Sequence, residues 1–279
     1  MFVNTYVCVF IRAGVRYNRT MRKRSTLVVL LLILGVLLVV RVWWPHVSFG
    51  YGGRWQAAMP GMDVRTLYWK TEYWFARVAV VRAEPARCVV RVLECHGRLA
   101  GAGARAGMVC PWPGAAINAS YFAEDLTPIG LLVTNGRHLA SRYPIGSWGA
   151  FWVRAGQPAL LMTPDVLPHD VTQALECKPR LVVAGRIPHF LPQPPARRSA
   201  VGMDAQGRIV LAATDARLTL DQWAACMRNG LRCVEALNLD GGPSTQLAVR
   251  GAVPIDIYGG GAVPVFVTIA PIRRAMAMP

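Results

Sequence analysis

The chain contains the stretch Glu235-Ala236-Leu237-Asn238-Leu239-Asp240-Gly241-Gly242-Pro243-Ser244-Thr245-Gln246-Leu247, in which a short apolar run gives way to an acid, two glycines and two hydroxyls. The run has the length of a buried strand and places Asp240 at its carboxyl end. The two glycines permit a positive φ or a close approach to a ligand. Ser244 and Thr245 add hydroxyl and backbone N–H groups. The stretch therefore predicts a strand followed by an oxygen-binding loop; an ordinary Asp-Gly turn is the alternative.

Outward from this stretch, three more polar residues lie at the ends of strand-like segments. Asn118 ends the apolar run 115–118, and Asp215 closes the strand predicted for residues 209–214. Arg198 stands beside a serine at the start of another apolar run. A planar, permanently charged guanidinium next to a hydroxyl suits two oxygens of a phosphate group. These positions favour one site at which several strand ends converge.

Four segments of the chain resemble the phosphodiester glycosidase family, and they occur in the family's order. The stretch quoted above is similar to its Asn-Leu-Asp-Gly-Gly-Gly-Ser-Thr signature. The other three are Ala116-Ile117-Asn118-Ala119-Ser120-Tyr121-Phe122, Gly130-Leu131-Leu132-Val133-Thr134-Asn135-Gly136-Arg137 and Arg198-Ser199-Ala200-Val201-Gly202-Met203-Asp204. The resemblance covers residues 74–271 and implies hydrolysis of a sugar-1-phosphodiester, for example of N-acetylglucosamine, between the anomeric carbon and its oxygen.

The resemblance assigns roles to individual residues. Most glycosidases need two carboxyl groups, but a phosphate ester already leaves readily, so one carboxylate and a cation can suffice. Asp240 is expected as the central catalytic carboxylate and Asp215 as a second, reserve one. The expected substrate-binding residues are Asn118, Phe122, Arg198, Gly241, Gly242, Ser244 and Thr245. Arg198 would clamp the phosphate, and Phe122 would stack on the sugar with Tyr121. No metal or other cofactor is expected.

Three positions depart from the family pattern. Pro243 replaces the third glycine of the signature and so removes one N–H donor from the loop. Cys177 and Lys178 stand where relatives have a small, glycine-containing turn. Residues 263–266 match a strand in which relatives often carry asparagine, so a substrate contact there is expected to be missing.

Residues 26–44 predict one transmembrane helix. Only Gly35 interrupts the apolar run as far as residue 40, and Val42-Trp43-Trp44 continue it past Arg41. Such a helix is about 28 Å long, close to the thickness of the hydrocarbon core. A cleaved signal peptide is disfavoured because no small-residue cleavage site follows. A buried core helix is disfavoured because the run is apolar on all sides.

The segments around this helix set the domain organisation. A basic leader over residues 1–25 predicts an inner-membrane protein with its amino terminus inside. Translation is hypothesised to start at Met21, which would leave residues 1–20 untranslated. Residues 45–65 are rich in glycine and aromatics and predict a linker. Residues 66–279 would then form a single exported domain, periplasmic or extracellular.

The formal charge of +16 is unevenly distributed. Six basic residues and no acid precede the apolar segment, whereas 24 basic and 15 acidic residues follow from residue 45 onward. Arginine carries nearly all of this positive charge, which indicates a coding bias more than a nucleic-acid-binding face. A diffuse attraction for anionic glycans or lipid headgroups is the functional alternative.

The exported part contains six cysteines, an even number that fits an oxidising compartment. A disulfide between Cys226 and Cys233 is favoured, because a helix stop and a strand start separate them; buried free thiols remain the alternative. The histidines lie far apart and no Cys-x-x-Cys pair occurs, so a metal site is disfavoured.

The element pattern predicts an α+β fold, a mixed β-sheet with packed helices. Strands are expected over residues 74–83, 87–94, 115–122, 181–184, 196–203 and 209–214, and hairpins turn at 135–136 and 155–157. Helices are expected over residues 99–109 and 221–228, the second capped by Thr219, and a helical turn over 170–176. The missing alternation of strands with long helices disfavours a doubly wound sheet.

Two functions from different classes fit this reading. The first is a membrane-anchored hydrolase of sugar-1-phosphodiesters in cell-envelope or exopolysaccharide metabolism. The second is a non-catalytic, membrane-tethered protein that binds glycans during exopolysaccharide assembly. Intact Asp240 and Arg198 favour the enzyme, whereas the departure at Pro243 favours the binder.

Overall fold

The computed structural model describes residues 26–39, 49–71, 74–95, 103–143, 148–162, 168 and 170–272. The chain divides into two compact units, Met1–Val47 and Ser48–Pro279, and each is described by itself.

In the first unit, residues 26–39 form a helix. Leucine, valine and isoleucine side chains lie on every side of this helix and are between 50% and 64% exposed. The predicted helix extends to residue 44, but residues 40–44 and the leader 1–25 lie outside the described residues. Within the described ranges, no helix combines the length and the apolarity that crossing a membrane requires.

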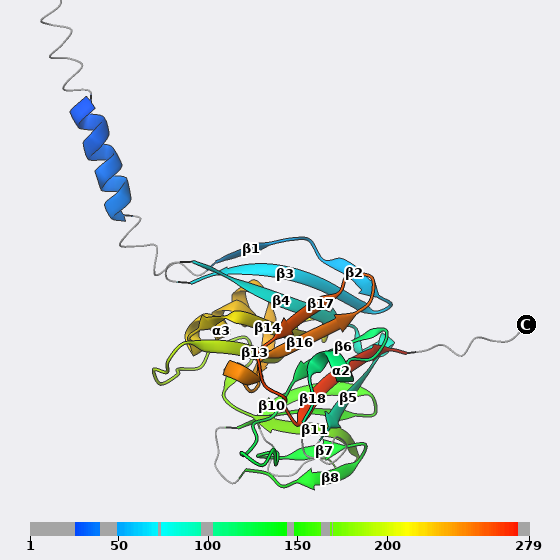
Figure 1. Cartoon of the computed structure of the whole chain (residues 1–279). Helices are drawn as coiled ribbons and strands as arrows, with labels where there is room; N and C mark the ends of the chain where they lie inside the picture. Colours follow the sequence, from blue (N-terminus) through cyan, green and yellow to red (C-terminus); the bar gives the residue numbers. More distant parts are fainter. Residues whose placement is uncertain are drawn as a thin grey trace, which may run out of the picture. The chain divides into compact units, whose positions relative to one another are not determined.

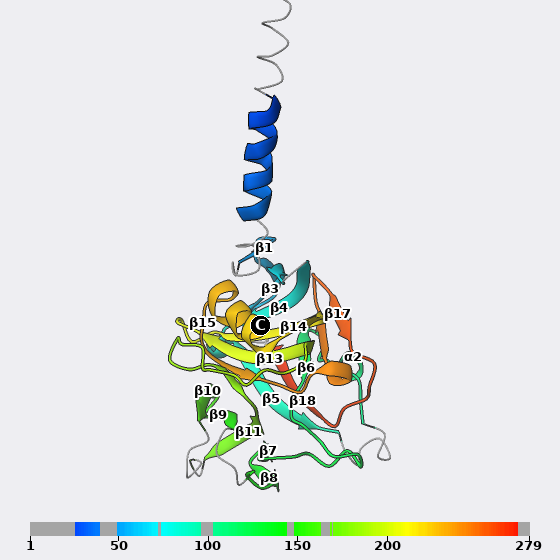
Figure 2. The same cartoon turned by 90° about the vertical axis from the view of Figure 1, so that its left-hand side faces the viewer.

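The described residues of the second unit form three β-sheets. The largest has the strand order β1 (Gly50–Gly52), β3 (Met62–Lys70), β4 (Phe75–Ala83), β14 (Ile209–Leu218), β13 (Ala196–Asp204), β15 (Cys233–Asn238) and β12 (Arg180–Val182), and β2 (Gln56–Met59) pairs with β3. The second has the order β10 (Gln157–Met162), β9 (Gly149–Arg154), β11 (Val171–Cys177), β7 (Leu132–Thr134) and β8 (Arg137–Ala140). The third has the order β17 (Ile255–Tyr258), β16 (Gln246–Arg250), β6 (Gly114–Asn118), β18 (Val265–Pro271) and β5 (Cys88–Glu94). Figures 1 and 2 show β1, β3 and β4 at one end of this unit and β7 and β8 at the other.

The main hydrophobic core lies between the sheets, because all three contribute fully buried side chains to it. They include Val81, Ile117, Leu132, Phe151, Leu175, Val201 and Val267. Along β13, Val201 belongs to this core, whereas the neighbouring Ala200 belongs to a second cluster on the opposite face of the largest sheet. This alternation is the period of two that a strand buried on both faces requires.

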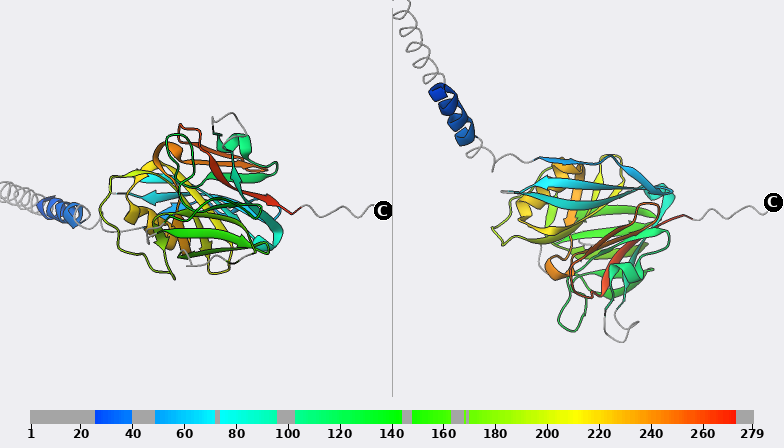
Figure 3. Two further views of the ribbon diagram at one scale, coloured as in Figure 1. Left: turned by 90° about the horizontal axis from the view of Figure 1, so that it is seen from below. Right: turned by 45° about the horizontal axis from the view of Figure 1, so that its top comes forward.

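The helix α3 (Leu220–Ala225) contributes Trp223, which is fully buried, to the second cluster. Thr219 begins this helix with a capping box, since its side chain accepts from the Gln222 N–H and the Gln222 side chain accepts from the Thr219 N–H. A π-helical turn, η3 (Cys226–Gly230), continues it. The short helix α2 (Ala106–Val109) packs beside β6 and β16 in a third cluster (Figure 3).

The fold contains more strand and less helix than the sequence predicted. All strand pairs among the described residues are antiparallel, so the prediction of a mixed sheet is wrong. The linker predicted for residues 45–65 is also wrong over 50–65, where β1, β2 and the start of β3 form. Tyr51 of β1 pairs with Tyr68 of β3, and their rings stack 5.4 Å apart. This cross-strand aromatic pair stabilises strands that glycines would otherwise disfavour.

The helical turn predicted for residues 170–176 is instead the strand β11. Polar residues point into the protein there and hide the period of two. The Gln173 side chain accepts from the Val92 N–H at 2.9 Å, and the Glu176 carboxylate accepts from the Leu131 N–H at 2.8 Å. By contrast, both predicted hairpins are confirmed, with positive φ at Asn135-Gly136 and at Ala155-Gly156.

The predicted disulfide between Cys226 and Cys233 is wrong. Cys226 and Cys233 are both free thiols. Cys226 and Cys233 are buried in the same apolar cluster, and burial raises the pKa of both thiols. A buried thiol behaves as a small apolar side chain, so the even cysteine count reflects packing here.

Candidate active site

The loop that follows β15 carries the chain from the largest sheet to the third one. Two backbone hydrogen bonds fix its start: the Leu239 N–H donates to the Ser199 carbonyl of β13, and the Asp240 N–H donates to the Ala119 carbonyl, both at 2.9 Å. The end of the strand predicted at Asp240 therefore lies where the largest sheet meets the third sheet. We call this junction the seam. The structure brings Asn118, Arg198 and Asp240 to this seam.

Asn118, the last residue of β6, joins the two sheets at the seam by hydrogen bonds. Its Nδ2 donates to the Asp240 carbonyl at 2.7 Å, and its Oδ1 accepts from the Ser199 hydroxyl at 2.7 Å and from the Gln246 N–H at 2.9 Å. The side chain is completely buried. Because these bonds occupy both ends of the amide, Asn118 positions the loop, which differs from the substrate contact that the sequence predicted.

Asp240 is partly buried at the beginning of the loop. Its Oδ1 accepts from the Gly241 N–H at 2.8 Å, and the Ser244 side chain is hydrogen-bonded to it as well. Burial raises the pKa of this carboxyl, and the two hydrogen bonds oppose the shift. A carboxylate with a raised pKa accepts a proton more readily than an ordinary aspartate does, which suits a base.

The loop requires glycine at positions 241 and 242 for two different physical reasons. A Cβ on Gly241 would lie 2.6 Å from the Arg197 carbonyl oxygen, so only glycine allows the loop to approach β13 this closely. Gly242 has open space around it but a φ of +59°, in the left-handed region. It starts the 3₁₀ turn η4 (Gly242–Ser244), which Pro243 fits because proline is tolerated at the start of a helical turn.

The two hydroxyls that follow differ in their surroundings. Ser244 is buried next to Asp240 and is hydrogen-bonded to it. Thr245 is completely buried, and its Oγ1 has no hydrogen-bond partner among the described residues. Ser244 is therefore placed to orient the carboxylate.

Arg198 is 7% exposed on β13. Its Nε donates to the Leu218 carbonyl at 3.0 Å, and its Nη2 donates to the Pro194 carbonyl at 3.5 Å. Within the described part of the chain, no carboxylate lies within 4.0 Å of its guanidinium. Burial lowers the pKa of Arg198. A buried cation without an acidic partner is a candidate for binding an anionic ligand.

Arg198 and Asp240 lie just beyond the same end of the β13–β15 pairing. In the antiparallel pair of β13 and β15, Ala200 lies opposite Asn238, and the hydrogen bond between Ser199 and Leu239 continues the pairing by one residue. Beyond this point the pairing ends, because the Asp240 N–H donates to Ala119, and Arg198 and Asp240 are the next residues along the two segments. The charges of both residues also act on the pKa of Tyr121. A cation and a carboxylate therefore lie at the same end of the largest sheet, and both charges reach Tyr121.

Asp215 lies in the middle of the long strand β14, where the sequence had predicted a strand end. Its carboxylate pairs with Arg77 at 3.0 Å and is half exposed. Together with Arg197, Gly242 and Pro243, it lines a cavity of about 390 Å³ beside the loop. The structure thus brings Asp215 to the loop that Asp240 begins, as a neighbour already bound to a cation.

The two predicted stacking aromatics point to different places. The Tyr121 hydroxyl donates to the Lys178 carbonyl at 2.8 Å, and its ring meets Trp148 edge-on at 5.9 Å. Burial is the largest cause of its raised pKa. Phe122 packs against the apolar cluster behind α2. The charges of Asp240 and Arg198 therefore act on Tyr121, whereas Phe122 packs against buried apolar side chains.

Sequence reasoning missed Asn238, which precedes the loop. Its Nδ2 donates to the carbonyls of Lys178 and Leu239, at 3.1 and 2.8 Å. It also missed Glu176, a completely buried carboxylate whose partners include the N–H groups of Leu131 and Tyr143. Asn238 could have been found from its place directly before Leu239 and Asp240 in the loop sequence. No such sequence signal pointed to Glu176, because its strand was predicted as a helical turn.

Three buried polar atoms around the seam have no hydrogen-bond partner among the described residues. They are Ser120 Oγ, Asn238 Oδ1 and Thr245 Oγ1. Buried polar groups are nearly always paired, so such a concentration indicates a site that water or a ligand completes. No group of three or more histidine, cysteine or acidic side chains that could hold a metal ion occurs in the described ranges.

The comparison with family models gives one match. The model of the phosphodiester glycosidase family matches residues 114–269, more than half of the chain. This range includes Asn118, Arg198, Asp215 and Asp240. No curated protein sequence matches the chain.

Solved structures with a similar fold come from animals and bacteria. The first is the zebrafish N-acetylglucosamine-1-phosphodiester alpha-N-acetylglucosaminidase catalytic domain, auto-inhibited by pro-peptide, with a TM-score of 0.60 at 16% identity over 79% of this chain and 87% of that chain. A Synechocystis protein has a TM-score of 0.55 at 17% identity over 77% and 64% of the two chains. An exported protein of Burkholderia pseudomallei has a TM-score of 0.55 at 11% identity over 81% and 97%. At these identities the likeness shows a shared fold.

Proposed function

The chain belongs to the phosphodiester glycosidase family, and from this we propose that it hydrolyses a sugar-1-phosphodiester. Water adds across the bond between the anomeric carbon and its oxygen. The products are a sugar with a free anomeric hydroxyl and a phosphate monoester. The zebrafish relative, whose name specifies N-acetylglucosamine-1-phosphodiester, makes that compound the first substrate to test.

The observation that carries the proposal is that Asp240 and Arg198 lie at the same end of the largest sheet, where the charges of both act on Tyr121. Asp240 acts as the base or nucleophile toward the anomeric carbon, and its raised pKa favours proton acceptance. Arg198 stabilises the negative charge that develops on the departing phosphate. Since the guanidinium has no acidic partner within 4.0 Å among the described residues, this charge is available to the substrate.

The remaining residues hold this pair in place. Asn118 fixes the carbonyl of Asp240, and Ser244 is hydrogen-bonded to its carboxylate. Gly241 lets the loop lie against β13. Asp215 and Arg197 line the adjoining cavity, where the part of the substrate beyond the phosphate would bind. Preorganisation of this kind lowers the cost of reaching the transition state.

We further propose that the protein is anchored in the inner membrane and acts outside the cytoplasm, on cell-envelope or exopolysaccharide material. The exposed, all-round apolar helix over residues 26–39 and the basic leader before it support this proposal. The chain itself, rather than a partner, would then hold the enzyme near its substrate.

The test is an assay of the full chain, purified in detergent, for sugar release from a panel of sugar-1-phosphodiesters. Asp240→Asn and Arg198→Ala should each reduce kcat by at least about a hundredfold. The matched controls are Asp256→Asn and Arg154→Ala, because both residues are exposed and lie in other ion pairs. These controls should keep wild-type rates, and circular dichroism should show that all four variants fold.

Two results would contradict the proposal. Turnover that survives both Asp240→Asn and Arg198→Ala would remove these residues from the chemistry. Absence of turnover across the panel, combined with saturable binding of the same glycans, would favour a tethered glycan-binding protein.

A further inference from the structure

A second cavity lies at the opposite end of the largest sheet from Asp240. Arg198 is near the start of β13 and Asp204 is its last residue, so about 20 Å of strand separates the two ends. The cavity, of about 430 Å³, opens between the β2–β3 turn, the 3₁₀ turn η2 (Pro85–Arg87) and the start of β14. The proposed catalytic residues do not line it.

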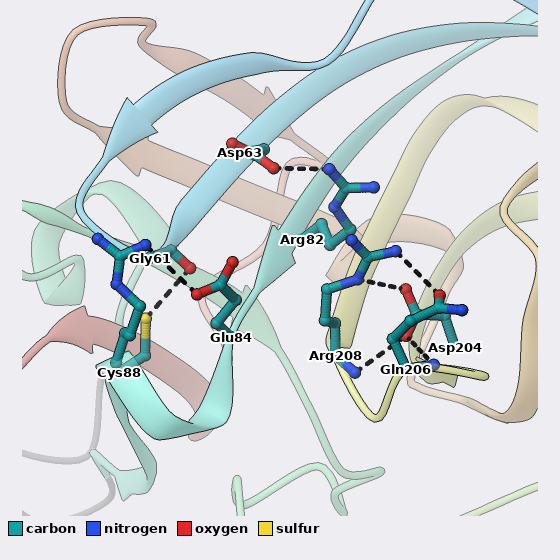
Figure 4. Close-up of polar contacts among 9 residues, drawn as sticks. Gly61, Asp63, Arg82, Glu84, Cys88, Asp204, Gln206 and Arg208 are labelled. Carbon is teal, nitrogen blue, oxygen red and sulfur yellow. Dashed lines mark hydrogen bonds and ion pairs between the residues drawn. The ribbon is translucent and has the colours of Figure 1, made fainter.

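Three arginines from three different elements line this cavity: Arg82 of β4, Arg87 of η2 and Arg208 before β14. Each is held by one carboxylate. Arg82 bonds Asp63 at 2.6 Å, Arg208 bonds Asp204 at 2.7 Å, and Arg87 bonds Glu84 at 3.3 Å. Figure 4 shows the first two of these ion pairs. The carboxylates fix the directions of the guanidinium groups and leave most of their N–H donors unused.

The arginines are crowded on one face of the sheet. Arg82 lies opposite both Asp63 and Val210, so Arg65 and Arg208, each two residues from one of these partners, are its diagonal neighbours on that face. The Asp63 and Asp204 carboxylates offset part of the repulsion between these like charges, and Arg65 has no such partner among the described residues.

The guanidinium groups of Arg65 and Arg82 also lack hydrogen-bond partners at Nε. Both Nε atoms are buried without a partner among the described residues. The same two side chains cover the ring of Trp55, at 5.9 and 4.0 Å from its centroid. Arg82 lines the cavity, so unused donors of its guanidinium lie beside a space in which an oxyanion can bind.

We propose that this cavity is a second, non-catalytic binding site for a phosphate- or sulfate-type oxyanion, held by Arg82, Arg87 and Arg208. Arg82, Arg87 and Arg208 are balanced by Asp63, Glu84 and Asp204, so the excess of one positive charge comes from the neighbouring Arg65, which has no ion pair among the described residues. One anionic group of a larger molecule matches that excess. A negatively charged glycan is the carrier that the chemistry favours, because its chain can continue along the open cavity.

The proposal does not depend on the proposed catalytic function. It is tested by calorimetric titration of the full chain in detergent with inorganic phosphate, in an Arg198→Ala background that removes the proposed phosphate clamp of the active site. Saturable binding in that background is expected, with a Kd on the order of 1 mM.

Arg87→Gln is the informative variant, because its side chain is 57% exposed and its removal spares the core. It should weaken phosphate binding by about tenfold, and Arg87→Glu should abolish it. The matched control is Arg154→Gln, a 53% exposed arginine paired with Asp170 on another sheet, which should leave binding unchanged. No saturable binding in the Arg198→Ala background, or equal binding by Arg87→Gln and Arg154→Gln, would overturn the proposal.

Competition identifies the carrier of the oxyanion. A phosphorylated oligosaccharide should displace phosphate, whereas its neutral counterpart should not. Displacement by a water-soluble, short-chain phosphatidylglycerol instead would support the oxyanion site and assign it to a lipid headgroup. Phosphate binding that neither carrier displaces would indicate an adventitious ion only and would overturn the proposal.

Discussion

At the residue scale, the site depends on the difference between groups that contact a ligand and groups that position them. Among the described residues, neither Asp240 nor Arg198 has an oppositely charged side chain within 4.0 Å. The side-chain amide of Asn118, in contrast, makes three hydrogen bonds within the protein. Substitutions at these positions should therefore change different properties, and the two roles can be separated by measuring stability and turnover together.

Asp240→Asn should make the protein more stable at neutral pH while removing activity. Burial raises the folded-state pKa of Asp240 above its unfolded value of about 3.9. The folded state therefore binds the proton more tightly, and stability falls as the pH rises from the unfolded value through the folded one. The asparagine variant does not lose stability in this way, because its side chain does not ionise.

Thermal unfolding of wild type and Asp240→Asn across the pH range checks this prediction. The difference in Tm should be largest above the folded-state pKa of Asp240 and should shrink at pH values below about 3.9. A wild-type protein that is more stable than the variant at pH 7 would contradict it.

Asn118→Ala should destabilise the protein strongly. The change leaves the Ser199 hydroxyl, the Gln246 N–H and the Asp240 carbonyl without their partner in a buried place. The expected loss is about 3 kcal/mol or more of the free energy of unfolding, measured with denaturant. The control is Asn229→Ala, which removes only a bond to the exposed Arg228 and should change stability little. A variant of unchanged stability with only a raised KM would instead make Asn118 a substrate contact.

At the element scale, the loop between β15 and β16 works because its glycines are not interchangeable. Gly241→Ala places a Cβ 2.6 Å from the Arg197 carbonyl and should displace the loop together with Asp240. Gly242→Ala meets no atom within 4 Å and should cost only about 1 kcal/mol for its positive φ. Steady-state kinetics should show a much larger fall in kcat for Gly241→Ala. Equal effects of the two changes would contradict this account of the loop.

The elements also show which parts of the structure the sequence could predict. Strands with regular apolar patterns, such as β4 and β15, and the turn at Asn135-Gly136 follow from local rules and are confirmed. β11 does not, because Gln173 and Glu176 are buried by partners on distant strands. Long-range hydrogen bonding of this kind leaves no local pattern.

The candidate site could be predicted in part for the same reason. The acid, glycine and hydroxyl residues of the loop are adjacent in sequence, so Asp240 was identifiable as the end of a strand. That Asn118 meets Ser199 and Asp240 depends on the joining of two sheets, which only the folded chain shows. The unpartnered atoms of Ser120 and Thr245 were equally beyond local rules.

At the scale of the whole molecule, the chain combines an apolar helix with a compact β-rich unit that begins at Ser48. Removal of residues 1–47 should release the protein from membranes without loss of turnover, because every candidate site residue lies in the second unit. Fractionation of cells that express either form checks this prediction. Wild-type protein in the soluble fraction would contradict the proposed anchor.

The central claim is cleavage between the anomeric carbon and its oxygen, and hydrolysis in ¹⁸O-labelled water tests it most directly. The full chain is incubated with N-acetylglucosamine-1-phosphodiester, and both products are analysed by mass spectrometry. The account predicts the label in the sugar, because water attacks the anomeric carbon. Label in the phosphate monoester would mean attack at phosphorus and would contradict the assignment of a glycosidase.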